Sequence, residues 1–147
     1  MPTISQSTTI ARPPEEVFAY LDDLAAHTEW QDGVESVKVL TEGPTKVGTE
    51  VEESRKVGNR QVQMRWRVTA HEPPRRSAFE TIESKMVKPS GVIVVAPSGE
   101  GSDVTFEMDP KPQGIGKLLS PFITRDIRKT VAGDLERLKR RLEGNSA

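Results

Sequence analysis

The chain has 147 residues, a formal net charge of −1 and no cysteine, which excludes disulfide bonds, thiolate metal sites and cysteine nucleophiles. With 34% hydrophobic and 29% charged residues, the composition is typical of a single globular domain, which we assign to residues 1–147. The longest strongly apolar run, residues 92–96, is too short to span a bilayer and residues 1–10 lack a secretory pattern, so we expect a cytoplasmic protein without stable membrane insertion.

The first thirty residues predict one strand and two short helices. Residues 3–10 are rich in β-branched side chains, which is typical of a strand. The run Pro13-Pro14-Glu15-Glu16 marks a helix start, because proline is tolerated in the first turn and carboxylates there stabilise the positive end of the helix dipole. A second short helix is expected before the turn signal at residues 31–33.

From residue 34 onward, apolar and polar side chains alternate with a period of two. The clearest case is residues 62–70, in which every second side chain is apolar, so one face of that strand is buried and the other is solvated. Further strands, separated by turn residues, are expected at 34–40, 47–57, 75–84, 92–95 and 104–108. Strands joined by successive hairpins, such as the one expected at Gly58-Asn59, predict an antiparallel sheet with one apolar face.

Residues 114–143 predict a long helix that covers this apolar face. Its apolar residues recur at steps of three and four and so form one stripe: Ile115, Leu118, Leu119, Phe122, Ile123, Ile127, Val131, Leu135, Leu138 and Leu142. Pro121 interrupts the pattern, and it either kinks the helix or, with Ser120 as N-cap, begins a second helical segment. In both cases residues 114–120 are offset from the rest, and we expect them to form a movable flap over a cavity entrance.

The C-terminal region is basic, with eight Lys or Arg against four Asp or Glu in residues 115–147. One interpretation is a solvated outer helix face with local pairs such as Glu136–Arg140. The other is a face that docks a protein or membrane partner. No aromatic residues interleave with the basic ones as single-strand binders require, so we expect no nucleic-acid partner.

Several stretches spread over nearly the whole chain carry a family resemblance. They are residues 11–21, Trp30 with 32–34, 47–49, 72–76 and 134–139. In these stretches the chain resembles the START / birch-pollen-allergen-like (SRPBCC) superfamily, and within it the polyketide cyclase/dehydrase-like proteins. The resemblance implies an α+β helix-grip fold, in which a curved antiparallel sheet of about seven strands wraps around the C-terminal helix. It also implies a cavity between sheet and helix for lipids, sterols, polyketides or other apolar molecules.

In such a fold, the apolar residues of the sheet and of the helix face each other across the cavity. We expect the ligand-binding wall to consist of Trp30, Val51, Met64, Trp66, Phe79, Phe106, Met108, Phe122, Ile123, Ile127 and Val131. No phosphate-binding glycine loop, metal-spaced histidine pair or nucleophile elbow occurs, so neither a cofactor nor a metal is expected. No pattern in the chain indicates an oligomeric state.

Two charged residues lie an even number of positions from Val47 and Val51 and therefore face the same side of the strand. We expect this side to be the inward face. The two residues are Glu53 and Arg55, and burying them is costly unless they are paired or hydrated. If they line the cavity, Arg55 is suited to orient a ligand carbonyl or carboxylate, and Glu53 to accept a proton. If the strand twists, bulges or ends near solvent, both are surface residues. They are the main catalytic candidates in the sequence, and both interpretations stay open.

Three further polar residues have structural interpretations. We expect His27 at the surface of its short helix, with a role as general base as the alternative. We expect His71 to face solvent, because Val68 and Ala70 hold the inward parity. Tyr20 is expected to pack at the edge of the core, with donation to a ligand as the alternative.

The sequence thus supports three functions. The first is binding or carriage of a small apolar ligand in the helix–sheet cavity. The alternative is a polyketide cyclase or dehydratase that uses the same cavity, because such enzymes can work by orienting the substrate. A second alternative is an interaction module that uses the basic face of the C-terminal helix.

Overall fold

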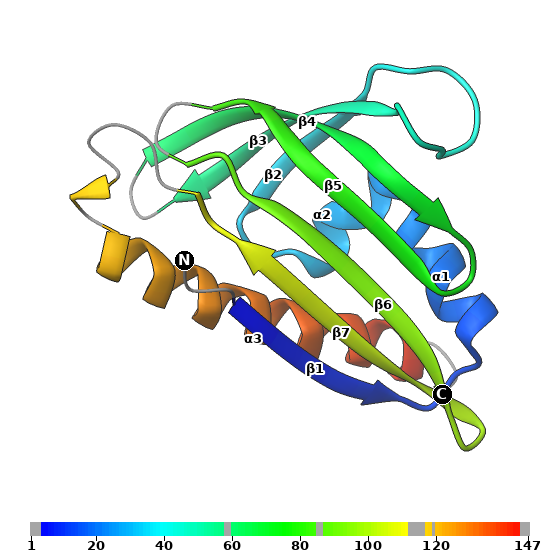
Figure 1. Ribbon diagram of the computed structural model, residues 1–147. Helices are drawn as coiled ribbons and strands as arrows, with labels where there is room; N and C mark the ends of the chain where they lie inside the picture. The colour runs from blue at the N-terminus through cyan, green and yellow to red at the C-terminus, as the bar shows by residue number, and fades with distance from the viewer. Residues whose placement is uncertain (1–3, 58–59, 85–86, 112–116, 119, 145–147) are drawn as a thin grey trace.

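The computed structural model describes residues 4–57, 60–84, 87–111, 117–118 and 120–144 (Figure 1). Along the chain, the elements are β1 (Ile4–Ile10), α1 (Pro14–Asp22), the 3₁₀ helix η1 (Leu24–Ala26), α2 (His27–Trp30), β2 (Val34–Val39), β3 (Glu50–Val57), β4 (Arg60–Glu72), β5 (Arg76–Glu83), β6 (Ser90–Ser98), β7 (Gly101–Asp109) and α3 (Ser120–Gly144). This order confirms the predicted α+β architecture, and η1 is an additional turn of helix between α1 and α2.

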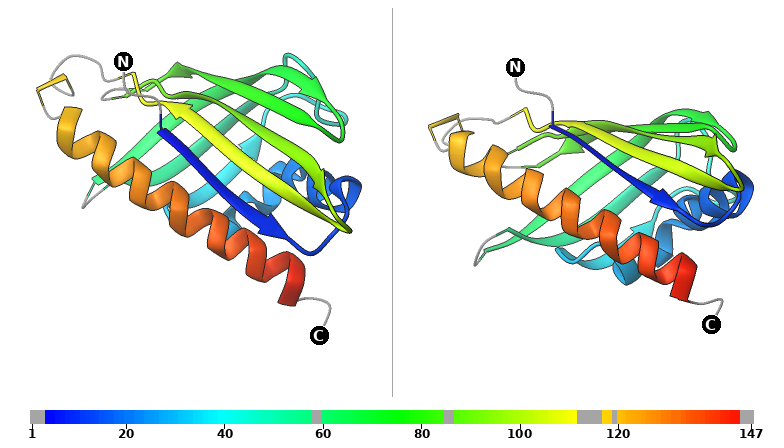
Figure 2. Two further views of the ribbon diagram at one scale, coloured as in Figure 1. Left: turned by 60° about the horizontal axis from the view of Figure 1, so that its bottom comes forward. Right: turned by 90° about the horizontal axis from the view of Figure 1, so that it is seen from below.

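The seven strands form one antiparallel sheet in the order β1-β7-β6-β5-β4-β3-β2. Strands β2 to β7 follow one another as neighbours, and β1 returns to pair with β7, where Ile4 lies opposite Met108 and Ile10 opposite Ser102. The sheet curves over α3, which lies along β1 across the concave side (Figure 2). The predicted helix-grip fold is therefore confirmed.

Among the described residues of helix α3, the buried apolar side chains all lie from Val131 onward. There its buried residues Val131, Leu135, Leu138 and Leu142 join the main core, together with side chains from α1, β1, β6 and β7. Toward its N-terminal end the same stripe loses contact with the sheet: Ile127 and Ile123 are half-buried, and Phe122 is 72% exposed. A straight helix against a curved sheet thus leaves a space at one end.

Two expectations about the apolar pattern are wrong. Val47 lies in the loop before β3 and is 59% exposed, because the strand begins only at Glu50, and Thr49 takes the buried position instead. Leu118 lies before α3 and is 80% exposed, so it is not part of the buried stripe. Periodicity alone extended each element across residues whose backbone forms a loop.

Helix α3 begins at Ser120, with Pro121 in its first turn. This start agrees with the second interpretation of Pro121, since the first turn is where a proline costs no helical hydrogen bond. The expected flap at residues 114–120 lies mostly outside the described residues, as do Ile115, Leu119 and the hairpin at Gly58-Asn59. The flap stays a prediction.

The expectation that His71 faces solvent is wrong because of a β-bulge. The pairing of β4 with β5 shifts register between Val68 and Ala70, so that the alternation of faces changes before His71 is reached. The ring of His71 packs on Phe18, and its Nε2 lies 2.9 and 3.0 Å from the carboxylate oxygens of Asp22. His71 therefore joins β4 to the end of α1.

Candidate functional site

A cavity of about 490 Å³ lies between the concave face of the sheet, the helices α1 and α2, and the N-terminal half of α3. This volume is within the range of pockets that hold small organic molecules. Ten of the expected wall residues line it, namely Trp30, Met64, Trp66, Phe79, Phe106, Met108, Phe122, Ile123, Ile127 and Val131. The structure therefore brings together side chains from α2, β4, β5, β7 and α3.

Val51, by contrast, is a core residue and does not line the cavity. It is fully buried in a second cluster with Leu24, Trp66 and Val68, beneath η1. The alternation of side chains predicts which face of a strand is inward. It cannot tell an inward residue that lines the cavity from one that another helix or strand covers. No sequence pattern signals η1, so parity alone assigns Val51 to the wall, and that assignment is wrong.

Aromatic rings form a continuous wall along one side of the cavity. Trp66 stacks on His27 with ring centroids 6.2 Å apart, Phe79 meets Trp66 edge-on at 5.7 Å, and Phe106 meets Phe79 at 6.4 Å. Gly91 on β6 makes room for this wall, because a Cβ at that position would lie 2.8 Å from a ring carbon of Phe79. Such rings give a large apolar contact surface with little side-chain entropy to lose on binding.

The charged residues Glu53 and Arg55 lie inside the cavity, which decides between the two interpretations of their strand. Glu53 is only 5% exposed, and its Oε1 accepts a hydrogen bond from Nε1 of Trp66 at 2.8 Å. Its Oε2 accepts from Nε of Arg55 at 2.9 Å, and Arg55 also donates from Nη2 to Oε1 of Gln31 at 2.7 Å. A buried carboxylate with both oxygens satisfied and a cation beside it is tolerated in an apolar setting.

Asp134 on α3 lies at the same end of the cavity and is not among the residues that the sequence pointed to. Its Oδ1 accepts hydrogen bonds from the backbone N–H of Asp32, at 3.0 Å, and from Nη2 of Arg137. Burial raises the pKa of the Asp134 carboxyl, although these hydrogen bonds and the nearby Arg55 act in the opposite direction. A signal was available, because Asp134 follows Val131 at the helical spacing of three residues.

His27 is buried and lines the cavity, so the expectation of a surface histidine is wrong. The four residues of α2 are too few to show a periodic pattern, and η1 turns the chain so that the ring lies against both tryptophans. Its Nε2 is 3.0 Å from the carbonyl oxygen of Leu21, and burial lowers the pKa of the imidazole. A neutral ring that donates from Nε2 presents Nδ1 as its acceptor.

The buried His27 predicts a specific loss of stability in acid. Because burial lowers the folded-state pKa below the ordinary value of 6.5, the unfolded chain binds this proton first. The contribution of His27 to the free energy of unfolding is therefore complete above pH 6.5 and is lost as the pH falls through the folded pKa. The free energy of unfolding changes by at most about 1.4 kcal/mol per pH unit for this one group.

Urea titrations between about pH 7.5 and pH 5 should show a steeper loss of unfolding free energy in the wild type than in His27→Gln. The difference between the two proteins isolates His27 from Asp134, whose raised pKa has the opposite sign and stabilises the folded state as the pH falls. Parallel curves for the two proteins would contradict the prediction.

Tyr20 packs at the edge of the core, as expected, and lies outside the cavity lining. Its hydroxyl donates to Oε1 of Glu29 at 2.7 Å, and burial together with this carboxylate raises the pKa of the phenol well above its ordinary value. The indole N–H of Trp30 is also buried, and among the described residues it has no hydrogen-bond partner.

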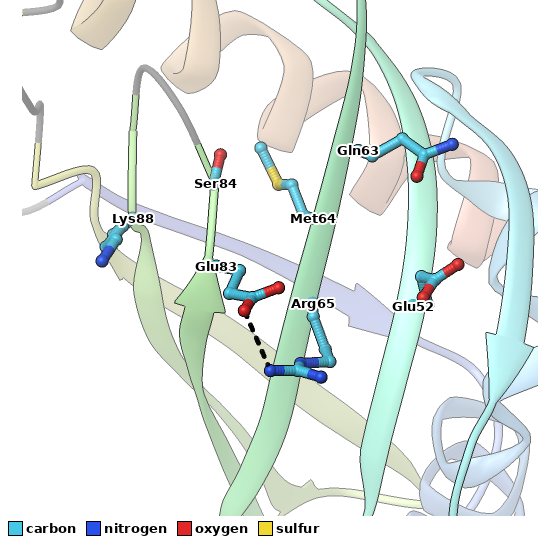
Figure 3. A pocket seen from close by; sticks show the side chains of 7 residues that line it. All are labelled: Glu52, Gln63, Met64, Arg65, Glu83, Ser84 and Lys88. Atoms are coloured by element: carbon cyan, nitrogen blue, oxygen red, sulfur yellow. Dashed lines mark ion pairs between the residues drawn. The ribbon is translucent and has the colours of Figure 1, made fainter.

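A second depression, of about 380 Å³, lies near the ends of β4 and β5 (Figure 3). Its lining is mostly polar and charged, and Arg65 pairs there with Glu83 at 3.1 Å. Within the described part of the chain, Met64 is the one apolar residue that lines it. This depression lacks the apolar surface that a hydrophobic ligand requires.

The basic residues of α3 divide into two groups. Arg137 bonds to Asp134 and to the carbonyl oxygen of Trp30, and Lys139 bonds to Glu143 and to the carbonyl oxygen of Thr9. Others, including Arg125, Arg128 and Lys129, are exposed on the outer face of the helix. Docking of a partner there stays a prediction. In the part of the chain that the structure describes, no helix has the length and hydropathy to cross a membrane.

Comparisons with known proteins give the same architecture. The crystal structure of TTHA0849 from Thermus thermophilus superposes with a TM-score of 0.85 at 22% identity, over 99% of this chain and 100% of that one. The Zhui aromatase/cyclase from Streptomyces sp. R1128 gives a TM-score of 0.75 at 18% identity, over 95% and 94% of the two chains. In sequence, Toxin Rv0910 of Mycobacterium tuberculosis H37Rv is 26% identical over 135 residues, which are 89% of this chain and 94% of the toxin.

A family model also matches almost the whole chain. The family is described as polyketide cyclase / dehydrase and lipid transport, and its model matches residues 1–143. The match confirms the resemblance noted in the sequence. The chain therefore belongs to the polyketide cyclase / dehydrase and lipid transport family.

Proposed function

We propose that this protein binds a small, mainly apolar molecule in the cavity between the sheet and α3. The observation that carries the proposal is the division of the cavity lining into two parts. One part is an aromatic and aliphatic wall, and the other is a compact polar group of Glu53, Arg55 and Gln31. An apolar pocket with a few polar groups in fixed positions is the usual form of a small-molecule site, in which the wall supplies affinity and the polar groups orient the ligand.

Titration with the neutral fluorescent probe N-phenyl-1-naphthylamine tests this proposal. We expect saturable binding of one probe per chain. Replacing Ile127, which lines the cavity, by tryptophan should lower the affinity about tenfold or more, because the larger ring occupies the probe's space.

The matched control is Lys129→Trp, which places the same ring on the exposed face of the same helix and should leave the affinity unchanged. Circular dichroism should show that both variants fold. Equal affinities for the two variants would place the probe outside the cavity, and an absence of saturable binding to the wild type would refute the proposal.

A cyclase or dehydratase activity is the second candidate. The observation that favours it is that Arg55 and the neutral His27 line the same cavity, so that one side chain is suited to orient a carbonyl and the other to accept a proton. Glu53 is less suited to be the base than the sequence suggested, since both of its oxygens already accept hydrogen bonds. An aromatase/cyclase of similar fold supports the same candidate.

Incubation with a reactive poly-β-ketone thioester, followed by product analysis, tests this activity. Turnover that is lost in His27→Gln and in Arg55→Gln would support it, whereas tight substrate binding without turnover would leave the binding function alone.

A further inference from the structure

We infer that the cavity selects an uncharged ligand, one whose polar end is a hydroxyl or carbonyl oxygen, over a carboxylate with the same apolar body. This inference rests on the proposed function and narrows it to a ligand class. It is carried by the distribution of charge around the cavity and by the hydrogen bonds that are already made there.

The first observation is that the cation in the polar group is already matched. Arg55 lies 2.9 Å from the carboxylate of Glu53, which is almost fully buried. The positive charge of Arg55 thus already has a counter-ion within the protein. A ligand carboxylate placed beside Arg55 would add a second negative charge to this pair in a poorly solvated space. Like charges in such a setting repel strongly, and the ligand would also lose its hydration shell.

The second observation is the balance of charge over the whole lining. The described lining contains five carboxyl groups, those of Asp22, Asp32, Glu53, Asp126 and Asp134, and two cationic side chains, Arg55 and Lys56. Cavity walls with an excess of one sign set the local potential, because the low-dielectric interior screens charges weakly. An anionic ligand is therefore disfavoured above all beside Glu53 and Asp134, the two buried carboxyl groups of the lining.

A cationic ligand is not selected either, because the deeper carboxylates already have partners. Glu53 accepts from Trp66 and Arg55, Asp134 accepts from Arg137 and the backbone of Asp32, and Asp22 is paired with His71. An ammonium group would have to displace one of these partners to find a counter-ion. The two remaining carboxylates, of Asp32 and Asp126, are exposed to solvent, which weakens their attraction.

Hydrogen-bond donors remain for a neutral oxygen. A guanidinium carries five N–H groups, and within the described chain Arg55 donates two hydrogen bonds, to Glu53 and to Gln31. The side chain lines the cavity and is held in place by these two acceptors. A hydroxyl or carbonyl oxygen can accept from the remaining N–H groups without adding charge, so the ligand's polar end is oriented toward β3 and its apolar body toward Phe79 and Ile127.

Competition between three ligands with the same alkyl chain tests the inference. Bound N-phenyl-1-naphthylamine is displaced at about pH 8 by dodecan-1-ol, dodecanoate or dodecylammonium. The alcohol is kept below its solubility limit, and the two charged ligands are kept below their critical micelle concentrations. The wild type should prefer the alcohol over each charged ligand by about tenfold or more. Equal or better competition by dodecanoate or dodecylammonium, or no displacement by dodecan-1-ol, would overturn the inference.

Glu53→Gln provides a second test, because it keeps the shape of the side chain and leaves the charge of Arg55 unmatched. In this variant the preference should shift toward dodecanoate by about tenfold relative to the wild type. Glu136→Gln is the matched control: it also exchanges a carboxylate for an amide, but at an exposed position of α3 outside the lining, so it should shift the preference by less than about twofold. Equal shifts in the two variants would contradict the role assigned to the Glu53–Arg55 pair.

The two proposals fail in different ways. If the probe does not bind the wild type, the proposed function is wrong. If the probe binds and dodecanoate competes as well as dodecan-1-ol, the proposed function stands and the inference alone is wrong. The wild-type comparison decides the inference even if Glu53→Gln does not fold.

Discussion

Replacing Trp66 by phenylalanine should lower the free energy of unfolding by about 2–4 kcal/mol, and the same change at Trp30 by about 0.5–1.5 kcal/mol. Both indoles are buried and both line the cavity, so the apolar area lost is similar. They differ in their N–H groups. That of Trp66 donates to the buried carboxylate of Glu53, whereas that of Trp30 has no partner among the described residues.

The expected difference follows from what each substitution leaves behind. Phenylalanine at position 66 leaves an oxygen of a buried carboxylate without its donor, and an unsatisfied charged group is costly. Phenylalanine at position 30 removes a donor that is desolvated without a compensating hydrogen bond within the described chain. Urea titrations followed by far-ultraviolet circular dichroism measure both losses. Equal losses would mean that the Trp66–Glu53 bond contributes nothing to stability.

Leu138→Ala is expected to lower the free energy of unfolding by about 3–5 kcal/mol, because it leaves a cavity in the core where α3 meets the sheet. Leu138 has 0% exposure and packs in the main cluster of the core. The matched control is Leu118→Ala, which removes the same atoms from a residue that is largely exposed before the helix. That change should alter stability by less than about 0.5 kcal/mol.

These two leucines occupy one stripe in the sequence, so their comparison tests the tertiary arrangement directly. Thermal unfolding followed by circular dichroism, together with a urea titration, gives both values. A loss at Leu118 as large as that at Leu138 would mean that residues before Ser120 pack against the core in solution.

Much of the cavity wall could be predicted from two periodicities. Alternation in β4 placed Met64 and Trp66 on the inward face, and spacing of three and four in α3 placed Ile123, Ile127 and Val131 opposite them. These predictions succeed because side chains point in the same direction at a fixed period along a regular helix or strand. The spacing of the hydrophobic residues therefore indicates which face packs against the rest of the protein.

The polar part of the site was only partly predictable. Parity placed Glu53 and Arg55 inward but could not say whether they pair, since that depends on Trp66 and Gln31 from other elements. The two histidines, expected in solvent, are buried or half-buried, because His27 follows a 3₁₀ turn and His71 follows a β-bulge. Both features break the regular repeat on which the prediction relied.

By itself, the sequence determined the order of the elements, the inward faces of the regular strands and the apolar stripe of α3, because local periodicity encodes them. Only the tertiary structure decided where the helix leaves the sheet, which inward residues line the resulting space and how its charges are matched. Those properties depend on the curvature of the sheet, on the bulges and on contacts between residues far apart in the chain. The ligand class inferred for the cavity depends on that second set of properties.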